Sequence, residues 1–179
     1  MGMEKTPAQL LLRAQNGDAD AFGALYALYA DELYAYALYV LGRRPDAEDA
    51  VQETCLRVYR SIRSIRKPDR IKAYFFKALS NTIRTLRRQA APAPLPDDAA
   101  LPDPADEAAG ADLRADLKAA LDALQPDERQ VVLLSAVAGL RSAEVGDAVG
   151  LTAGAARSKL SRALRKMRPY LTEPGRETE

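Results

Sequence analysis

Residues 150–168, GLTAGAARSKLSRALRKMR, place two glycines and a hydroxyl residue directly before a run of lysines and arginines. Two kinds of chemistry use such residues. A loop that binds a nucleotide phosphate needs Gly, four residues and then Gly-Lys-Ser/Thr, so that backbone N–H groups and the lysine converge on the phosphate. Here Gly154 is followed by two alanines and Arg157. The spacing excludes the phosphate loop and favours a turn that begins a basic helix.

Apolar residues recur at steps of three and four from Ala153 onward, which predicts one apolar stripe of a helix. This stripe consists of Ala156, Leu160, Ala163, Leu164 and Met167. Thr152 is placed to cap the helix, and Gly150 suits the bend before it. A short helix capped by Ser142 precedes that bend, and the pair predicts a helix-turn-helix, a motif that reads duplex DNA. A solvated surface helix has the same charges but needs no such short helix and turn.

The face of this helix away from the stripe carries the residues that we expect to contact duplex DNA. Arginine can bind guanine O6 and N7 together, whereas lysine suits phosphate contacts at the flanks. The sequence alone does not say which arginine reads a base. The candidates are Arg157, Ser158, Lys159, Ser161, Arg162, Arg165 and Lys166.

A second cluster, in the N-terminal half, is acidic. Asp49, Gln52 and Glu53 are spaced by three and four residues, so they share one face of a helix. Acids in the first turn of a helix also suit the helix dipole, and that explanation covers Asp46 and Glu48. It covers the other three poorly, which makes their face a candidate binding surface.

A third cluster is basic and contains aromatic residues. Cations beside aromatic rings bind single-stranded DNA, and an amide can read the edge of an unpaired base. Tyr74 and Asn81 are placed for this role, although Asn81 is equally consistent with a polar surface residue; Phe75 and Leu79 are expected in the core. The candidates are Arg66, Lys67, Arg70, Lys72, Tyr74, Lys77, Asn81, Arg84 and Arg88.

Composition and charge divide the chain in two. Net charge is +1, but residues 1–91 hold 15 cations against 10 acids, whereas residues 92–120 hold 2 against 7. The region 91–110 is rich in Pro, Ala and Asp, which predicts an extended, flexible linker. We therefore expect domains at 1–90 and 111–172 and a disordered tail at 173–179. Basic regions on both sides of an acidic connector suggest a polyanionic partner.

Both domains are predicted to be helical, so the expected fold is all-α: two small helical domains joined by the linker. No stretch alternates with the period of a strand for more than a few residues. In the first domain we expect helices at 6–16 and 20–41, a third capped by Asp46 that ends near Ile65, and a fourth capped by Asp69 over 71–89. In the second, helices at 111–124 and from Pro126 precede the helix-turn-helix.

Several function classes are excluded by what the sequence lacks. It contains no His, and its single cysteine, Cys55, can form neither an internal disulfide nor a zinc site. We expect no catalytic site, no metal and no cofactor, and hence no enzyme. No uncharged apolar run reaches the length of a membrane span, and no signal peptide is apparent. These features predict a cytoplasmic protein.

Three segments, in order, resemble the extracytoplasmic-function (ECF) class of bacterial RNA polymerase sigma factors, group 4 of the sigma-70 family. The segment that contains DAEDAVQET, residues 46–54, resembles region 2, and IKAYFFKALSNTIRTLRR, residues 71–88, resembles the helix that reads and melts the −10 element. Residues 124–168, from LQPDERQ to the basic helix, resemble region 4, which binds the −35 element. Departures include Tyr74 for the usual Trp, Cys55 after QET, Thr85 for an Asp, and Ala155 for a Thr.

The resemblance implies a DNA-binding subunit that directs promoter-specific transcription initiation and regulation. It implies that Asp49, Gln52 and Glu53 bind the clamp helices of the polymerase β′ subunit, that core RNA polymerase also contacts the chain through the β flap, and that promoter DNA is the nucleic acid bound. It further implies restraint by an anti-sigma factor, without membrane insertion of this chain itself. The alternative is a free-standing helix-turn-helix regulator that binds an operator as a dimer, which explains the second domain but not the clusters in the first.

Overall fold

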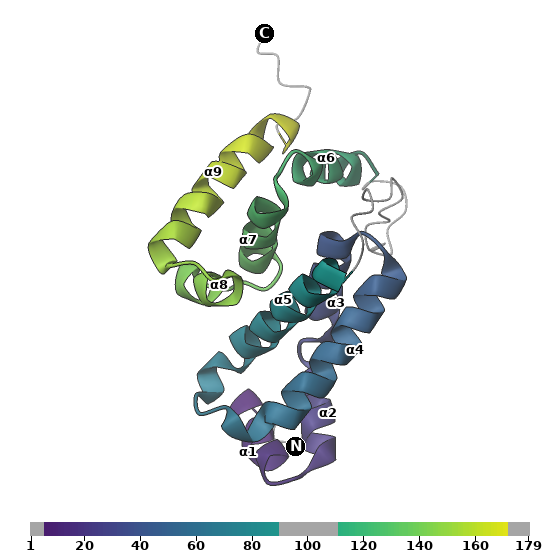
Figure 1. The fold of residues 1–179 in the computed structure, drawn as a ribbon, viewed down its shortest axis with the longest axis vertical. Helices are drawn as coiled ribbons and strands as arrows, with labels where there is room; N and C mark the ends of the chain where they lie inside the picture. Colours follow the sequence, from purple (N-terminus) through teal and green to yellow (C-terminus); the bar gives the residue numbers. More distant parts are fainter. Residues whose placement is uncertain (1–5, 90–110, 172–179) are drawn as a thin grey trace, which may run out of the picture.

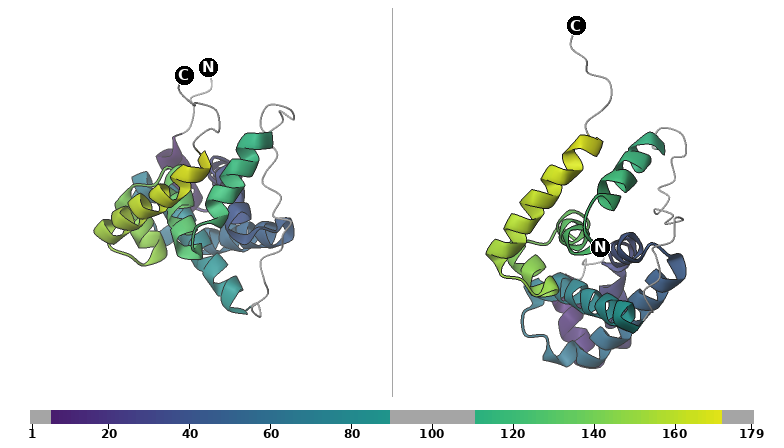
Figure 2. Two further views of the ribbon diagram at one scale, coloured as in Figure 1. Left: turned by 90° about the horizontal axis from the view of Figure 1, so that it is seen from above. Right: turned by 45° about the horizontal axis from the view of Figure 1, so that its top comes forward.

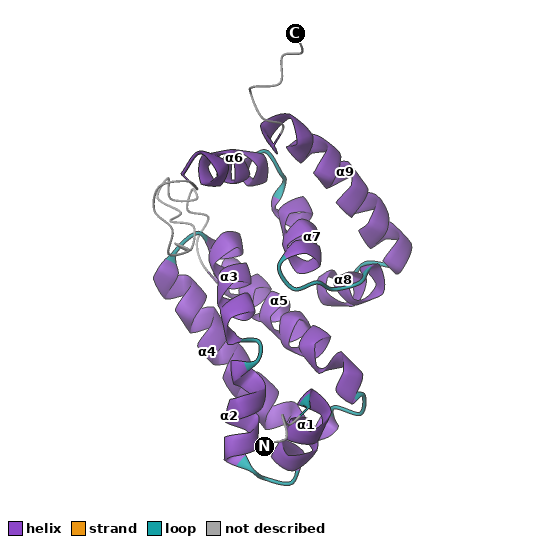
Figure 3. Ribbon diagram, turned by 180° about the vertical axis from the view of Figure 1, so that it is seen from behind, coloured by secondary structure: helices purple, strands orange, loops and turns teal. Residues whose placement is uncertain are grey.

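The computed structural model describes residues 6–89 and 111–171, and within these ranges it contains helices and loops but no strand (Figures 1 and 3). The first range forms an N-terminal domain. Its helices are α1 (Pro7–Gln15), α2 (Ala19–Ala27), α3 (Ala30–Leu41), α4 (Arg44–Ser61), the short 3-10 helices η1 (Ile62–Ser64) and η2 (Pro68–Arg70), and α5 (Ile71–Gln89). The second range forms a C-terminal domain of α6 (Ala111–Asp122), α7 (Pro126–Ala136), α8 (Ser142–Val149) and α9 (Ala153–Leu171). The expected all-α fold with two helical domains is confirmed.

The N-terminal domain is built around α5, which packs against α3 and α4. Phe75, Phe76 and Leu79 are fully buried, as the expectation for Phe75 and Leu79 required. The ring of Phe76 meets Tyr36 of α3 edge-on at 5.7 Å between ring centroids. Burial of apolar surface of this kind is the dominant favourable contribution to folding, and aromatic side chains bury more of it than smaller residues do.

The helix-turn-helix consists of α8 and α9, with α6 and α7 packed against α9. Two glycines make its turn possible. Gly150 ends α8 in the left-handed conformation at φ 77°, which glycine adopts without the strain that a side chain brings. At Gly146 an added Cβ would lie 2.5 Å from the backbone oxygen of Leu151, so the turn can approach α8 only because this position has no side chain.

The two domains touch each other. Helix α8 contacts α5, and α7 contacts α3, an arrangement that can be followed in Figures 1 and 2. Burial raises the pKa of Tyr36 to about 12, and hydrogen bonds with Ser80 of α5 and Gln130 of α7 oppose this rise. Arg70 Nη1 lies 3.9 Å from Asp147 Oδ2 of α8. The sequence did not predict this contact between domains.

Some expected boundaries are wrong. The single helix expected at 20–41 is two helices, because the chain bends at Leu28 and Tyr29 before α3 begins. The N-caps expected at Asp46, Asp69 and Ser142 are also wrong: Asp46 lies in the first turn of α4, Asp69 lies in η2, and Ser142 is the first residue of α8. Thr152 does cap α9, since its Oγ1 accepts a hydrogen bond from Ala155 N at 3.2 Å.

The linker expected at 91–110 and the tail expected at 173–179 lie outside the described residues. Helix α6 begins directly after the first of these ranges, at Ala111. The domain boundaries at 90 and 111 therefore stay predictions.

Candidate functional site

The predicted acidic face of α4, formed by Asp49, Gln52 and Glu53, is brought together as expected. The three side chains line one surface hollow between α4 and α5. The neighbouring residues Ala50 and Thr54 are buried, and Thr54 Oγ1 lies 3.2 Å from Thr82 Oγ1 of α5. This packing fixes α4 against α5 and leaves Asp49 and Gln52 exposed and Glu53 half-buried at the edge of the contact.

The hollow contains more than the three predicted residues. Leu56, 45% exposed, and Leu86 add apolar surface, and Thr82 and Thr85 of α5 complete the lining. Leu56 was overlooked although it lies four residues after Gln52, a spacing that puts both on one face. Arg57 Nε donates a hydrogen bond to Glu53 Oε1 at 2.7 Å and so partly neutralises that acid.

The predicted basic residues around α5 do not form one uniform surface. Most residues of the predicted set, which includes Tyr74 and Asn81 besides the cations, are exposed. The exceptions are Lys72 and Tyr74, which are half-buried. Lys72 Nζ lies 2.6 Å from Glu32 Oε2 of α3, so its charge is already paired within the domain. The exposed members are Arg66, Lys67, Arg70, Lys77, Asn81, Arg84 and Arg88.

The two base-reading candidates of α5, Tyr74 and Asn81, differ in how their side chains are held by hydrogen bonds. The Tyr74 hydroxyl donates a hydrogen bond to Ser61 Oγ at 3.0 Å, which holds the ring against the end of α4. Asn81 is exposed, and its Oδ1 accepts a hydrogen bond from Arg84 Nη1 at 3.2 Å. The amide NH₂ group of Asn81 faces no such bond within the described ranges, so it is the better placed of the two to meet an unstacked base.

On α9, the predicted duplex-reading residues lie on the side away from the domain core. Arg157, Ser158, Ser161, Arg162 and Arg165 are all exposed. The stripe behind them is narrower than expected. Ala156, Ala163 and Met167 are buried, Leu160 is half-buried, and Leu164 is 50% exposed.

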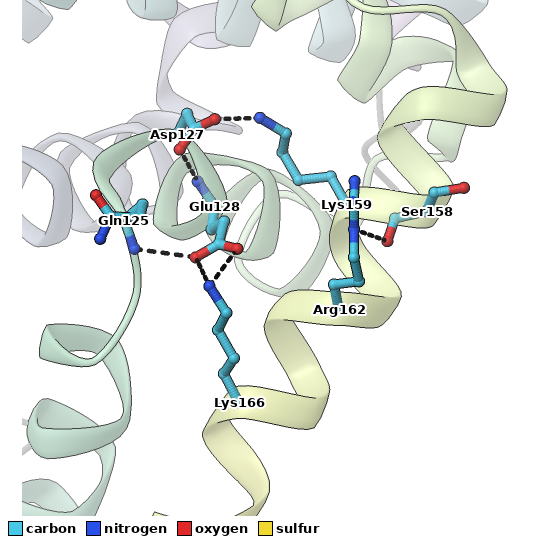
Figure 4. Close-up of polar contacts among 7 residues, drawn as sticks. All are labelled: Gln125, Asp127, Glu128, Ser158, Lys159, Arg162 and Lys166. Carbon is cyan, nitrogen blue, oxygen red and sulfur yellow. Dashed lines mark hydrogen bonds and ion pairs between the residues drawn. The ribbon is translucent and has the colours of Figure 1, made fainter.

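The two lysines of this set are ion-paired to the start of α7, as Figure 4 shows. Lys159 Nζ contacts Asp127 Oδ2, and Lys166 Nζ lies 2.7 Å and 2.8 Å from the two carboxylate oxygens of Glu128. The hydrogen bond from Lys159 lowers the pKa of Asp127, and the one from Lys166 lowers the pKa of Glu128. Both acids therefore stay charged at neutral pH. The sequence expectation treated these lysines as free cations.

Metal and membrane features were searched in the same two ranges. No group of three or more acid or cysteine side chains there is arranged to hold a metal ion. Across residues 6–89 and 111–171, no helix is both long enough and apolar enough to cross a membrane.

Comparison with known proteins defines the class first. The Sigma-70 region 2 family matches residues 25–92, and the Sigma-70, region 4 family matches residues 114–167. A chain with both regions in this order is a sigma-70-type protein.

Curated relatives narrow the class. CarQ from Myxococcus xanthus, an RNA polymerase sigma factor, is 33% identical over 165 residues that cover 90% of this chain and 95% of CarQ. The ECF RNA polymerase sigma factor SigL from Mycobacterium tuberculosis is 32% identical over 168 residues, with the same coverage of 90% and 95%. SigE from Mycolicibacterium smegmatis is 33% identical over 158 residues, and the match spans 61% of SigE. The chain belongs to the family of ECF RNA polymerase sigma factors.

Solved structures agree on the fold. CnrH, in complex with the cytosolic domain of CnrY, matches with a TM-score of 0.70 at 24% identity, over 94% of this chain and 99% of that one. RpoE from Bartonella quintana, in complex with the anti-sigma factor NepR, matches with a TM-score of 0.71 at 23% identity, over 86% and 98%. The alternative of a free-standing helix-turn-helix regulator is not favoured, because it does not account for the match of residues 25–92 to Sigma-70 region 2.

Proposed function

We propose that this chain binds core RNA polymerase and directs it to promoters by reading a −10 and a −35 element. The observation that carries the proposal is the presence, in one chain, of an outward acidic face on α4, an exposed cationic surface around α5 and an exposed arginine face on a helix-turn-helix. A repressor that binds an operator needs the third surface alone.

In this proposal the acidic face binds the β′ clamp helices. Asp49 and Gln52 are exposed, whereas Glu53 shares its charge with Arg57. The apolar surface of Leu56 and Leu86 within the same hollow gives a partner helix something to bury. A polar rim around an apolar centre is the usual composition of a specific protein interface.

The N-terminal domain, residues 1–90, reads and melts the −10 element. Exposed Lys77 and Arg88 suit phosphate contacts along a single strand, and Asn81 suits the edge of an unpaired base. Lys72 has a structural role instead, since it pairs with Glu32.

The C-terminal domain, residues 111–172, reads the −35 element through α9. Arg157, Arg162 and Arg165 present guanidinium groups that can bind guanine O6 and N7, and Ser158 and Ser161 lie between them. The same domain contacts the β flap of the polymerase. Such a protein acts where the polymerase is, in the cytoplasm, lends specificity without catalysing a reaction, and is restrained by an anti-sigma factor.

The experiment is a pull-down of core RNA polymerase with the full chain, followed by run-off transcription on genomic fragments. We expect a stable complex that initiates at a defined set of sites. Binding of DNA without any binding of core polymerase would contradict the proposal and favour an operator-binding regulator.

A further inference from the structure

The first turn of α7 carries two acids whose local role accounts for only part of their contacts. Glu128 Oε2 accepts a hydrogen bond from the backbone N–H of Gln125 at 3.0 Å and closes a capping box. Asp127 Oδ1 accepts one from the N–H of Glu128 at 3.0 Å. Acids at this position also suit the helix dipole. These contacts would be satisfied equally well by neutral Gln and Asn side chains.

The charges of both acids face α9 rather than solvent alone. Asp127 pairs with Lys159 and Glu128 with Lys166, seven residues apart on α9 (Figure 4). Seven residues are about two turns, or roughly 10 Å along the helix axis. The two pairs thus connect α7 to α9 at two heights along the DNA-reading face, and Arg162 and Arg165 line the same hollow.

The two pairs differ in which partner is covered. The Glu128 side chain is 13% exposed and its carboxylate accepts two bonds from Lys166, which is 49% exposed. The Asp127 side chain is 62% exposed, whereas its partner Lys159 is 22% exposed. Water and salt reach one partner of each pair, so both restraints are moderate in strength.

A lysine that is already paired contributes less to DNA affinity. When a free lysine binds a phosphate, the DNA releases a condensed counterion, and log K falls with log salt by about 0.9 for each such contact. A paired lysine must first leave its carboxylate, and the carboxylate then lies close to the phosphates. The acids at the start of α7 thus oppose sequence-independent binding without touching the arginines.

We propose that Asp127 and Glu128 are positioning residues of the −35-reading surface, which hold Lys159 and Lys166 away from DNA phosphates and leave recognition to the arginines. This inference rests on the proposed function of α9. The two ion pairs lower the non-specific affinity for DNA and keep the base-reading arginines available. Specificity rises because the sequence-independent phosphate contacts are weakened.

The test compares full-length protein with the double variant Asp127→Asn/Glu128→Gln. Both substitutions keep the hydrogen-bond acceptors of the α7 cap. The probe is a fluorescein-labelled 25-base-pair duplex of mixed sequence, followed by anisotropy between 50 and 200 mM KCl. We expect the double variant to bind more tightly at 50 mM and to have a salt slope steeper by up to about 1.8, two contacts of about 0.9 each. Over this fourfold salt range its advantage then shrinks about twelvefold. Each single variant should give part of this increase.

Two controls separate the possible failures. Asp122→Asn removes one negative charge, as Glu128→Gln alone does, but it frees Lys118 of α6 and Arg129 of α7 instead of a lysine of α9, so its salt slope should stay at the wild-type value. Lys159→Gln/Lys166→Gln should reduce the slope strongly in the double variant and only slightly in the wild-type background. Circular dichroism checks that every variant is folded.

Two negative outcomes of this experiment would have different meanings. If the lysine substitutions reduce the slope as strongly in the wild-type background as in the double variant, the acids do not restrain them and the inference is overturned, while DNA binding by α9 stands. If neither the lysine substitutions nor Arg162→Ala affects DNA binding in any background, α9 is not the duplex-binding helix and the proposed function itself fails.

Discussion

Helices α5 and α9 are the two helices that we propose to face DNA, and they are held in different ways. Each has 19 residues, and each carries cations on the side away from its domain core. The buried side of α5 is large and aromatic, with Phe75, Phe76 and Leu79 fully enclosed. That of α9 has two alanines and Met167, and ion pairs at its edge connect it to α7.

This difference indicates which conditions and substitutions should affect each helix. The position of α5 depends on burial, which is insensitive to salt, so a change in its core affects the whole domain. The position and free charge of α9 depend partly on exposed and half-exposed ion pairs, which salt and single charge substitutions alter. We therefore expect α5 variants to act mainly through stability and α9 variants mainly through DNA binding.

The largest effect should come from the α5 core. Phe75→Ala removes a fully buried ring that meets Phe22, Tyr26 and Tyr29 at 5.8–6.5 Å between ring centroids. Large-to-small substitutions of this kind cost about 3–5 kcal/mol. Urea unfolding measures the loss. Leu164→Ala on α9, where the side chain is 50% exposed, is the control and should change stability by about 0.5 kcal/mol or less.

The next effect concerns the acidic face. Asp49→Lys/Glu53→Lys should weaken core polymerase binding by about 2 kcal/mol or more, because charges that complement a partner become repulsive. A fluorescence titration with core polymerase measures it. Glu48→Lys, an exposed acid of the same helix that does not line the hollow, should have little effect. Equal losses from both changes would indicate a general charge effect and remove the face from the binding site.

On α9 the arginines should matter more than the lysines. Arg162→Ala or Arg165→Ala should weaken binding to a −35 duplex by about 1–3 kcal/mol and relax the preference at one base pair, if that arginine bonds guanine with both arms. Lys166→Ala should cost less, because Glu128 already neutralises Lys166. Competition binding with single-base variants of the duplex distinguishes the two. A loss of preference on removing Lys166 would assign base reading to the lysine.

The smallest effect should come from the contact between the domains. Asp147→Asn removes the 3.9 Å pair with Arg70, in which both side chains are exposed, and such pairs contribute about 0–1 kcal/mol. Spin labels at Ala24→Cys and Ala143→Cys, in a Cys55→Ala background, report the interdomain distance. We expect a modest broadening of that distance. The control Asp20→Asn should leave the distribution unchanged, and a broadening of equal size there would exclude a specific role for Asp147.

The sequence predicted the helical fold, the helix-turn-helix and the acidic face because these depend on local spacing. Gly150 forms the bend between α8 and α9, and Thr152 caps the start of α9, both as expected. Asp49, Gln52 and Glu53 share a face because helix periodicity alone requires it. The bend at Tyr29 was missed, since no Gly or Pro marks it.

Pairing across elements could not be predicted in the same way. Lys166 and Glu128 are separated by 38 residues, and Lys72 reaches Glu32 on another helix. Such pairs follow from how helices pack, which the periodicity of a single helix does not contain. The exposure of Leu164 has the same origin, because the width of the covered stripe on α9 depends on its neighbours α6 and α7.

The central claim is that one chain reads two separate promoter elements, and photo-crosslinking tests it most directly. The −10 and −35 elements are about 25 base pairs apart, as their numbers indicate, which is roughly 85 Å at ~3.4 Å per base pair. A photoreactive amino acid at Asn81 on α5, and separately at Ser161 on α9, is used in the complex of full-length protein, core polymerase and a promoter found by run-off transcription. We predict crosslinks from Asn81 near −10 and from Ser161 near −35, which also requires the α5–α8 contact to open. Crosslinks from both positions within one helical turn of DNA would contradict the account.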